Sequence, residues 1–164
     1  MREGIEEGTG DGRLNSYPQF ATDELHPLCV YDSDEPLGHV EQTLLDWGMS
    51  TKRVRNCAEA IAALGNLAPP SLVLTDASLP DGTWLDVLRI AGSLPTGGVP
   101  VIVVSPFVDI HLYLEVLENG GHDFVVPPVT HAEMAHIIGT AILKGQFHNS
   151  GERHRSPANA SESG

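Results

Sequence analysis

Hydrophobic residues recur along the middle of this chain in two alternating patterns. Short continuous apolar runs, such as residues 72–74 and 101–104, are typical of strands that are buried on both faces of a sheet. Between such runs, apolar residues repeat every three or four positions. The repeat Leu37, Val40 and Leu44 places one buried stripe along a helix. The middle of the chain therefore alternates strand and helix.

Residues that start or stop helices separate these segments. Pro36 suits the first turn of a helix, Gly48 ends one, and Thr130 with Glu133 forms a capping-box pattern. The expected strands lie at residues 27–31, 51–55, 72–76, 99–105 and 124–126, and the expected helices at 35–47, 58–64, 83–91, 110–118 and 130–142. Five strands that alternate with five helices predict an α/β fold, a doubly wound parallel sheet covered on both faces.

The two ends of the chain lack these patterns. Residues 1–26 are rich in glycine and acids without an apolar period, which predicts a disordered acidic N-terminal segment. Residues 145–164 are polar and too short for a second domain, which predicts a disordered tail. We therefore expect a single folded domain over residues 27–144.

Composition narrows the class of protein further. The net charge is −13 and only nine of the 164 residues are Lys or Arg, which disfavours nucleic acid and acidic membrane surfaces as partners. No apolar run approaches the roughly 20 residues that span a bilayer, and no secretory signal begins the chain. Cys29 and Cys57 are typical of small core residues in a reducing compartment. These features predict a cytoplasmic protein that binds neither nucleic acid nor membrane.

Polar residues gather where the predicted strands end. Asp76 ends an apolar run, and a Pro-Asp-Gly turn at 80–82 follows. Asp32 and Asp34 follow the first strand, and Ser105 ends the fourth. Because right-handed crossovers place the carboxyl ends of parallel strands at one edge, these side chains are expected to converge. Carboxylates there suit Mg²⁺, and one of them could attack phosphorus.

The same residues resemble the receiver domain of two-component response regulators, over about residues 27–141. Asp76, followed by Pro80 and Gly82, resembles the phosphoacceptor aspartate and its loop. The other matching positions are the acidic cluster Asp32-Ser33-Asp34-Glu35, the hydroxyl residue Ser105, the aromatic switch position Phe124 and the proline Pro128. The combined spacing is specific, although any one of these motifs alone would be weak.

The resemblance implies a flavodoxin-like (βα)5 fold with strand order 2-1-3-4-5. It implies that Asp76 is the phosphoacceptor, that Ser105 assists it and that Phe124 is a switch residue. It also implies a Mg²⁺ site formed by Asp32, Asp34, Asp76 and the backbone carbonyl of Ser78. The expected protein is a signalling module and not an enzyme. Its expected partners are a histidine kinase or phosphotransfer protein and a downstream protein, with a homodimer left open.

Three positions depart from the family pattern. Pro127 stands where the family carries a lysine, Ser33 separates two acids that are usually adjacent, and Trp84 replaces a frequent glycine. Losing one donor to a transferring group typically costs about 2.7–4 kcal/mol, or 100- to 1000-fold in rate. Two interpretations of Trp84 stay open, a cover over the pocket or a contact surface.

Three alternative functions remain to be weighed. The missing lysine favours a pseudo-receiver that binds partners without phosphorylation. Asp32-Ser33-Asp34 also resembles the nucleophile motif of haloacid dehalogenase-like phosphatases, but the chain lacks that family's later lysine and second acidic pair. A nucleotide- or flavin-binding module is disfavoured because no glycine-rich loop follows the first strand.

Overall fold

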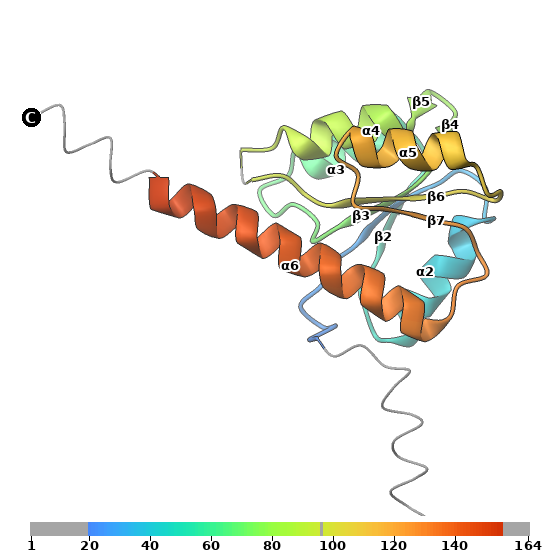
Figure 1. Ribbon diagram of the computed structural model, residues 1–164, viewed down its shortest axis with the longest axis horizontal. Coiled ribbons are helices and arrows are strands. Elements are labelled where there is room, and N and C mark those ends of the chain that lie inside the picture. The colour runs from blue at the N-terminus through green and yellow to red at the C-terminus, as the bar shows by residue number, and fades with distance from the viewer. Residues whose placement is uncertain (1–19, 96, 156–164) are drawn as a thin grey trace, which may run out of the picture.

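The computed structural model describes residues 20–95 and 97–155 and places a five-stranded parallel sheet at the centre of the fold (Figure 1). The strands of the sheet are β1 (Leu28–Val30), β2 (Lys52–Val54), β3 (Val73–Asp76), β6 (Val101–Val104) and β7 (Asp123–Val125). The helices are α2 (Leu37–Asp46), α3 (Cys57–Leu64), α4 (Trp84–Gly92), α5 (Ile110–Glu118) and α6 (His131–Arg155). The spatial order β2-β1-β3-β6-β7 confirms the predicted order 2-1-3-4-5 of the main strands.

Alternating residues of the central strands supply two separate hydrophobic clusters, one on each face of the sheet. Val73, Val101 and Val103 face one layer, which contains α3, α4 and Val116 of α5. Leu74 and Ile102 face the other layer, which contains α2 and α6. Figure 1 shows these two layers on opposite sides of the sheet. Burial on both faces explains why these strands are continuously apolar in sequence.

A short hairpin follows the central strand β3. Strands β4 (Ser78–Leu79) and β5 (Gly82–Thr83) pair antiparallel around the predicted Pro-Asp-Gly turn. A Cβ atom on Gly82 would lie 2.8 Å from Sγ of Cys57, so glycine permits the hairpin to approach α3 closely. Thr83 then caps α4 in a capping box with Asp86. The sequence predicted the turn but not the paired strands.

Trp84, the first residue of α4, is buried in the cluster beneath α3 and α4. Trp84 is only 6% exposed, which disfavours the second of its two interpretations, a contact surface. The residue packs as part of the core because the capping box sets it at the start of the buried stripe of the helix.

The folded region extends further in both directions than the pattern predicted. Leu25 is buried and Phe20 packs on the cluster beneath α2 and α6, although both fall within the expected disordered segment 1–26. Helix α6 was expected to end near residue 142 but continues to Arg155, and it projects past the sheet in Figure 1. The rest of both expected terminal segments, residues 1–19 and 156–164, lies outside the described residues.

Within the part of the chain that the structure describes, no helix combines the length and apolar character needed to cross a membrane.

Candidate functional site

Asp76 lies at the carboxyl end of β3, in the middle of the sheet and opposite Val104 of β6. It is a buried carboxylate, with only 7% of the residue exposed. Its Oδ1 atom is buried and has no hydrogen-bond partner among the described residues. Buried polar atoms are almost always paired, so this oxygen marks a place where a cation, a proton or a ligand donor is needed.

The electrostatic surroundings of Asp76 favour its protonated form. Burial raises the pKa of the Asp76 carboxyl to about 7, and the negative charge of Asp32 contributes to the increase. This coupling shows that the loop after β1 brings Asp32 to the same rim, as the sequence predicted. A positive ion between the two carboxylates would reverse the effect and stabilise the ionised form.

Asp34 has a different environment from Asp32. Its Oδ1 atom lies 2.9 Å from Nη2 of Arg53, which comes from β2. The guanidinium of Arg53 also lies 4.0 Å from the centre of the Tyr31 ring. The ion pair and the cation–π contact together hold Arg53 beside the acidic loop. The carboxylate of Asp34 therefore already has a positive partner, whereas Asp32 and Asp76 have none among the described residues.

The structure also reveals a buried acid that the sequence analysis missed. Glu41 of α2 accepts a hydrogen bond from the Tyr31 hydroxyl and another, of 2.8 Å, from the Thr51 hydroxyl. Burial raises the pKa of the Tyr31 hydroxyl, and its hydrogen bond to Glu41 adds to that rise. The signal was present in the sequence, because Glu41 stands four residues after Leu37 in the apolar stripe of α2.

Ser105, which follows β6, is buried at the same rim but its hydroxyl is engaged locally. The hydroxyl donates to the carbonyl of Phe107 at 3.0 Å and accepts from the Phe107 amide at 3.2 Å. The Ser105 amide donates to the carbonyl of Val125. The residue lies where the sequence placed it, with its hydroxyl used in a turn.

The loop after Asp76 is tied to the neighbouring helix α3. The Asp81 carboxylate accepts the amide of Cys57 at 2.7 Å and the amide of Ala58 at 3.0 Å. These bonds, first that of Cys57, hold the pKa of Asp81 below its usual value. Ser78, whose backbone carbonyl was predicted to bind metal, lies in β4 with an exposed side chain. The sequence identified Asp81 only as a turn residue, because its partners are distant in the chain.

Phe124 of β7 is half-buried and touches an exposed apolar surface. Its ring meets that of Tyr113 of α5 edge to face, with 6.1 Å between the ring centres. Large exposed apolar side chains continue from there along α5 and the loop before it. We call this set the α5 surface: Phe107, Val108, Ile110, Tyr113, Leu114 and Leu117. Val116 is the single residue of α5 that is buried.

The rim meets the basic requirements of a Mg²⁺ site without forming a complete one. No group of three or more His, Cys, Asp or Glu side chains is arranged to hold a metal within the described residues. Mg²⁺, however, keeps several waters and commonly uses one or two carboxylates together with a phosphate. Asp76 with its unpartnered oxygen, and the nearby Asp32, supply those two carboxylates.

Comparison with known proteins agrees with this geometry. Residues 28–139 match the family model of the response regulator receiver domain. The response regulator protein PilR of Pseudomonas aeruginosa is 30% identical over 116 residues, which cover 70% of this chain and 25% of PilR. The DNA-binding response regulator MtrA of Mycolicibacterium smegmatis is 26% identical, over 73% of this chain and 51% of MtrA. The chain thus spans about half or less of these curated relatives.

Solved structures show the same fold. The signal receiver domain of a signal transduction histidine kinase from Syntrophus aciditrophicus is 27% identical, covers 73% of this chain and 91% of its own, and has a TM-score of 0.60. A receiver domain protein from Clostridium thermocellum is 19% identical, covers 75% and 98%, and has a TM-score of 0.64. The family match extends over most of the chain and includes the whole rim around Asp76, so this chain belongs to the response regulator receiver domain family of two-component signalling, whose members are signalling modules and not enzymes.

Proposed function

We propose that Asp76 accepts a phosphoryl group and that the domain passes this signal to a protein partner. The observation that carries the proposal is the Asp76 carboxylate itself, which is buried at the carboxyl end of the central strand with one oxygen unpartnered. A merely structural aspartate at a strand end would use that oxygen in a cap or turn, as Asp81 does nearby.

The chemical step is the transfer of a phosphoryl group from a histidine nitrogen to a carboxylate oxygen. An ionised oxygen of Asp76 attacks the phosphorus of a phosphohistidine on a histidine kinase or phosphotransfer protein. The new bond joins the carboxyl oxygen to phosphorus, the nitrogen–phosphorus bond breaks, and the released imidazole takes up a proton. Because the pKa of Asp76 is raised to about 7, only part of the population is ionised near neutral pH without a cation.

Asp32, Asp76 and the backbone carbonyl of Ser78 would hold the Mg²⁺ that receiver domains typically bind. The ion would supply positive charge that ionises Asp76 and neutralises the transferring phosphoryl oxygens. Asp34 could join them only after its ion pair with Arg53 opens. In this proposal two carboxylates bind the ion. Binding by a third, that of Asp34, would require breaking its ion pair with Arg53.

Two features weaken this pocket relative to a typical receiver. Pro127 occupies the position in which the family carries a lysine, and a proline offers neither a cation nor an amide donor. The Ser105 hydroxyl would have to leave its turn with Phe107 to reach a phosphoryl oxygen. We therefore expect Asp76 to be phosphorylated slowly, in line with the loss of one or two donors to the transferring group.

The α5 surface is the proposed docking site for the downstream partner. It is apolar and exposed: Val108 is 80% exposed and Phe107 75% exposed. Such a surface seldom remains on a protein without a partner. Phe124 contacts it through Tyr113 and lies on β7, whose neighbour β6 leads to Ser105. A rearrangement of Phe124 when Ser105 leaves its turn would therefore change this surface.

A phosphorylation assay tests the proposal. The full chain is incubated with acetyl phosphate and Mg²⁺, and its intact mass is followed over time. We expect a slow gain of one phosphoryl group that disappears with EDTA and in Asp76→Asn. The matched control is Asp81→Asn, which changes a carboxylate in the same loop that caps α3 and should keep the mass gain. A mass gain that persists in Asp76→Asn contradicts the proposed site.

A pseudo-receiver is the second candidate. The local engagement of Ser105 and Asp34 favours it, as does Pro127 in the lysine position. In that case the α5 surface binds its partner without phosphate, and the domain acts as a constitutive interaction module. The absence of any mass gain in the assay, together with unchanged tryptophan fluorescence from Trp47 and Trp84 on adding beryllofluoride and Mg²⁺, would establish this alternative.

A further inference from the structure

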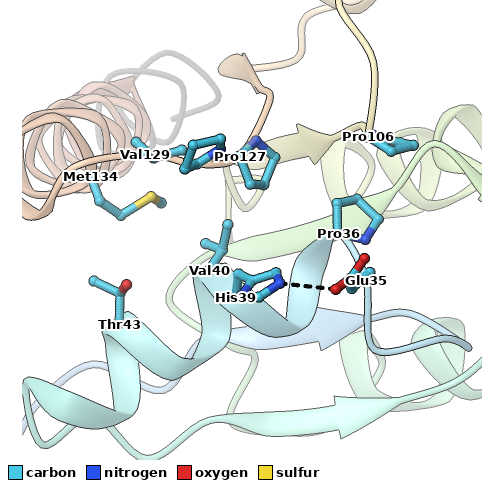
Figure 2. Close-up of a pocket in the computed structure, with 10 residues that line it drawn as sticks. Glu35, Pro36, His39, Val40, Thr43, Pro106, Pro127, Val129 and Met134 are labelled. Carbon is cyan, nitrogen blue, oxygen red and sulfur yellow. Dashed lines mark hydrogen bonds and ion pairs between the residues drawn. The ribbon is translucent and has the colours of Figure 1, made fainter.

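A cavity of about 640 Å³ lies beside the phosphoacceptor rim, between α2 and the loop that joins β7 to α6. Figure 2 shows side chains from α2 on one side of it, and side chains from that loop and from the start of α6 on the other. It adjoins the Asp76 site at Pro127, although none of Asp32, Asp76 or Ser105 lines it. The lining residues are Glu35, Pro36, His39, Val40, Thr43, Pro106, Pro127, Pro128, Val129 and Met134.

Most of the wall is apolar and stiff. Four of the ten lining residues are prolines, whose rings have little freedom to move. Val40 and Met134 are buried, at 3% and 1% exposed, and form the deep part of the wall. A wall that is already rigid pays little conformational entropy when a molecule binds to it. The volume lies within the range of about 300–1,000 Å³ that is typical of small-molecule sites.

The polar groups lie on one side of the cavity. Glu35 Oε1 and Nε2 of His39 are 3.2 Å apart, and both side chains are exposed at the mouth. Glu35 is the single Asp or Glu in the lining, and no Lys or Arg lines it. Asp32 precedes Glu35 by three residues and has no positive partner among the described side chains. The mouth of the cavity therefore carries one carboxylate, paired with His39, while the interior is apolar.

We propose that this cavity binds a small amphiphilic amine, a molecule with an apolar ring or short chain and a protonated amino group. The apolar part packs against the proline rings, Val40 and Met134. The amino group lies at the mouth, where it donates to the carboxylate of Glu35. An anionic ligand of the same shape binds more weakly, because it would face Glu35 and the acidic loop with no lysine or arginine in the lining to pair with.

The test uses two probes with the same ring and opposite charge. Phenethylamine and phenylacetate are titrated into the isotopically labelled full chain at neutral pH without phosphate donor or Mg²⁺, and backbone amide shifts are recorded by NMR. We expect phenethylamine to shift the amides of His39, Val40, Val129 and Met134 along a saturable curve. Phenylacetate should bind about tenfold more weakly. The result is independent of whether Asp76 is phosphorylated.

One variant tests the carboxylate at the mouth of the cavity, and a second tests its apolar interior. Glu35→Gln should weaken phenethylamine binding about two- to fivefold, the range for an exposed ion pair, and should narrow the difference between the probes. Its control, Glu118→Gln, removes an equal charge from α5 and should leave binding unchanged. Thr43→Trp places a ring at the half-buried edge of the cavity and should abolish saturable binding. Gln42→Trp, at the exposed neighbouring position of α2, is its control.

Several outcomes would overturn the proposal. Equal affinity for the two probes would show that the charge at the mouth plays no part. Shifts that remain in Thr43→Trp, or that map to residues outside the lining, would place the ligand elsewhere. If neither probe binds, but raising the concentration of the chain shifts the same amides, then the cavity is an interface between two copies of this chain.

Discussion

Helices α4 and α5 have the same length and cover the same face of the sheet, yet they are packed very differently. Each has nine residues and a largely apolar sequence. Helix α4 buries Trp84, Val87, Leu88 and Ala91, whereas α5 buries only Val116. Helix α4 also packs against α3, to which the hairpin after Asp76 is hydrogen-bonded, while α5 lies next to the edge strand β7.

This difference separates two uses of hydrophobic residues. In α4 they stabilise the fold and hold the loop that follows Asp76. In α5 they remain at the surface, where they add little to stability and are available to a partner. The same amino-acid types therefore serve structure on α4 and, in the function we propose, recognition on α5. Each claim can be tested by changing one side chain.

The largest effect on stability is expected from Trp84→Ala. Removing this buried ring should lower the free energy of unfolding by about 3–5 kcal/mol, because a large cavity forms between α3, α4 and the sheet. The matched change on the other helix, Leu114→Ala, should alter it by less than about 0.5 kcal/mol. Urea unfolding followed by circular dichroism measures both. Similar losses in the two variants would show that α5 is packed as firmly as α4.

The next effect concerns the carboxyl of Asp76, where the loop that leads to α4 begins. Its pKa is raised from 3.8 to about 7 in the folded chain, so the folded state keeps a proton that the unfolded state releases. The stability from this group is complete below about pH 4, decreases as pH rises, and is lost above about pH 7. The sign is thus opposite to that of a salt-bridged carboxylate.

Asp76→Asn removes this titration, because an amide stays neutral. In EDTA, the variant should gain about 1–2 kcal/mol over the wild type between about pH 4 and pH 8. This gain in unfolding free energy is smaller than the full pKa shift of Asp76 implies, because solvent screens the charge. Unfolding curves across pH measure the gain, and Mg²⁺ should reduce it. A constant difference across pH would mean that Asp76 is ionised throughout.

A smaller effect is expected from the helix caps. Thr83→Ala removes the capping box of α4 and should cost about 1 kcal/mol of unfolding free energy. Asp109 caps α5 by accepting the amide of Leu112 at 3.1 Å. Because α5 contributes a single buried residue, Asp109→Ala should unfold α5 locally while leaving the global transition nearly unchanged. Amide hydrogen exchange in the two helices distinguishes local from global opening.

The smallest effect concerns the ion pair at the opposite edge of the rim. Arg53→Ala releases the Asp34 carboxylate, which then becomes available to a cation. We expect the affinity for Mg²⁺ to rise about two- to fivefold, the equivalent of an exposed ion pair of about 0.5–1 kcal/mol. Isothermal titration calorimetry measures it. Arg55→Ala, on the same edge, is the control. An unchanged affinity would show that Asp34 plays no part in the site.

Much of the fold followed from the apolar pattern alone. Strands β3 and β6 are continuously apolar because both of their faces are buried, and this made them the easiest to predict. The same rule located Asp76, because the apolar run stops at the carboxylate. The end of α6 was misplaced, because the residues after 142 are mostly polar and a helix that extends beyond the sheet has no apolar stripe to reveal it.

The partners of the rim residues could not be predicted in the same way. Whether Asp34 faces a metal or Arg53, and whether Ser105 faces a phosphoryl group or its own turn, depends on atoms that lie far apart in sequence or on a few dihedral angles. The sequence by itself determined the order of elements, the position of Asp76 and the convergence of acids at one edge, because backbone period and crossover handedness are local rules. Only the tertiary structure decided the burial of Trp84, the exposure of α5 and the proline-lined cavity, because each depends on which helices meet in space.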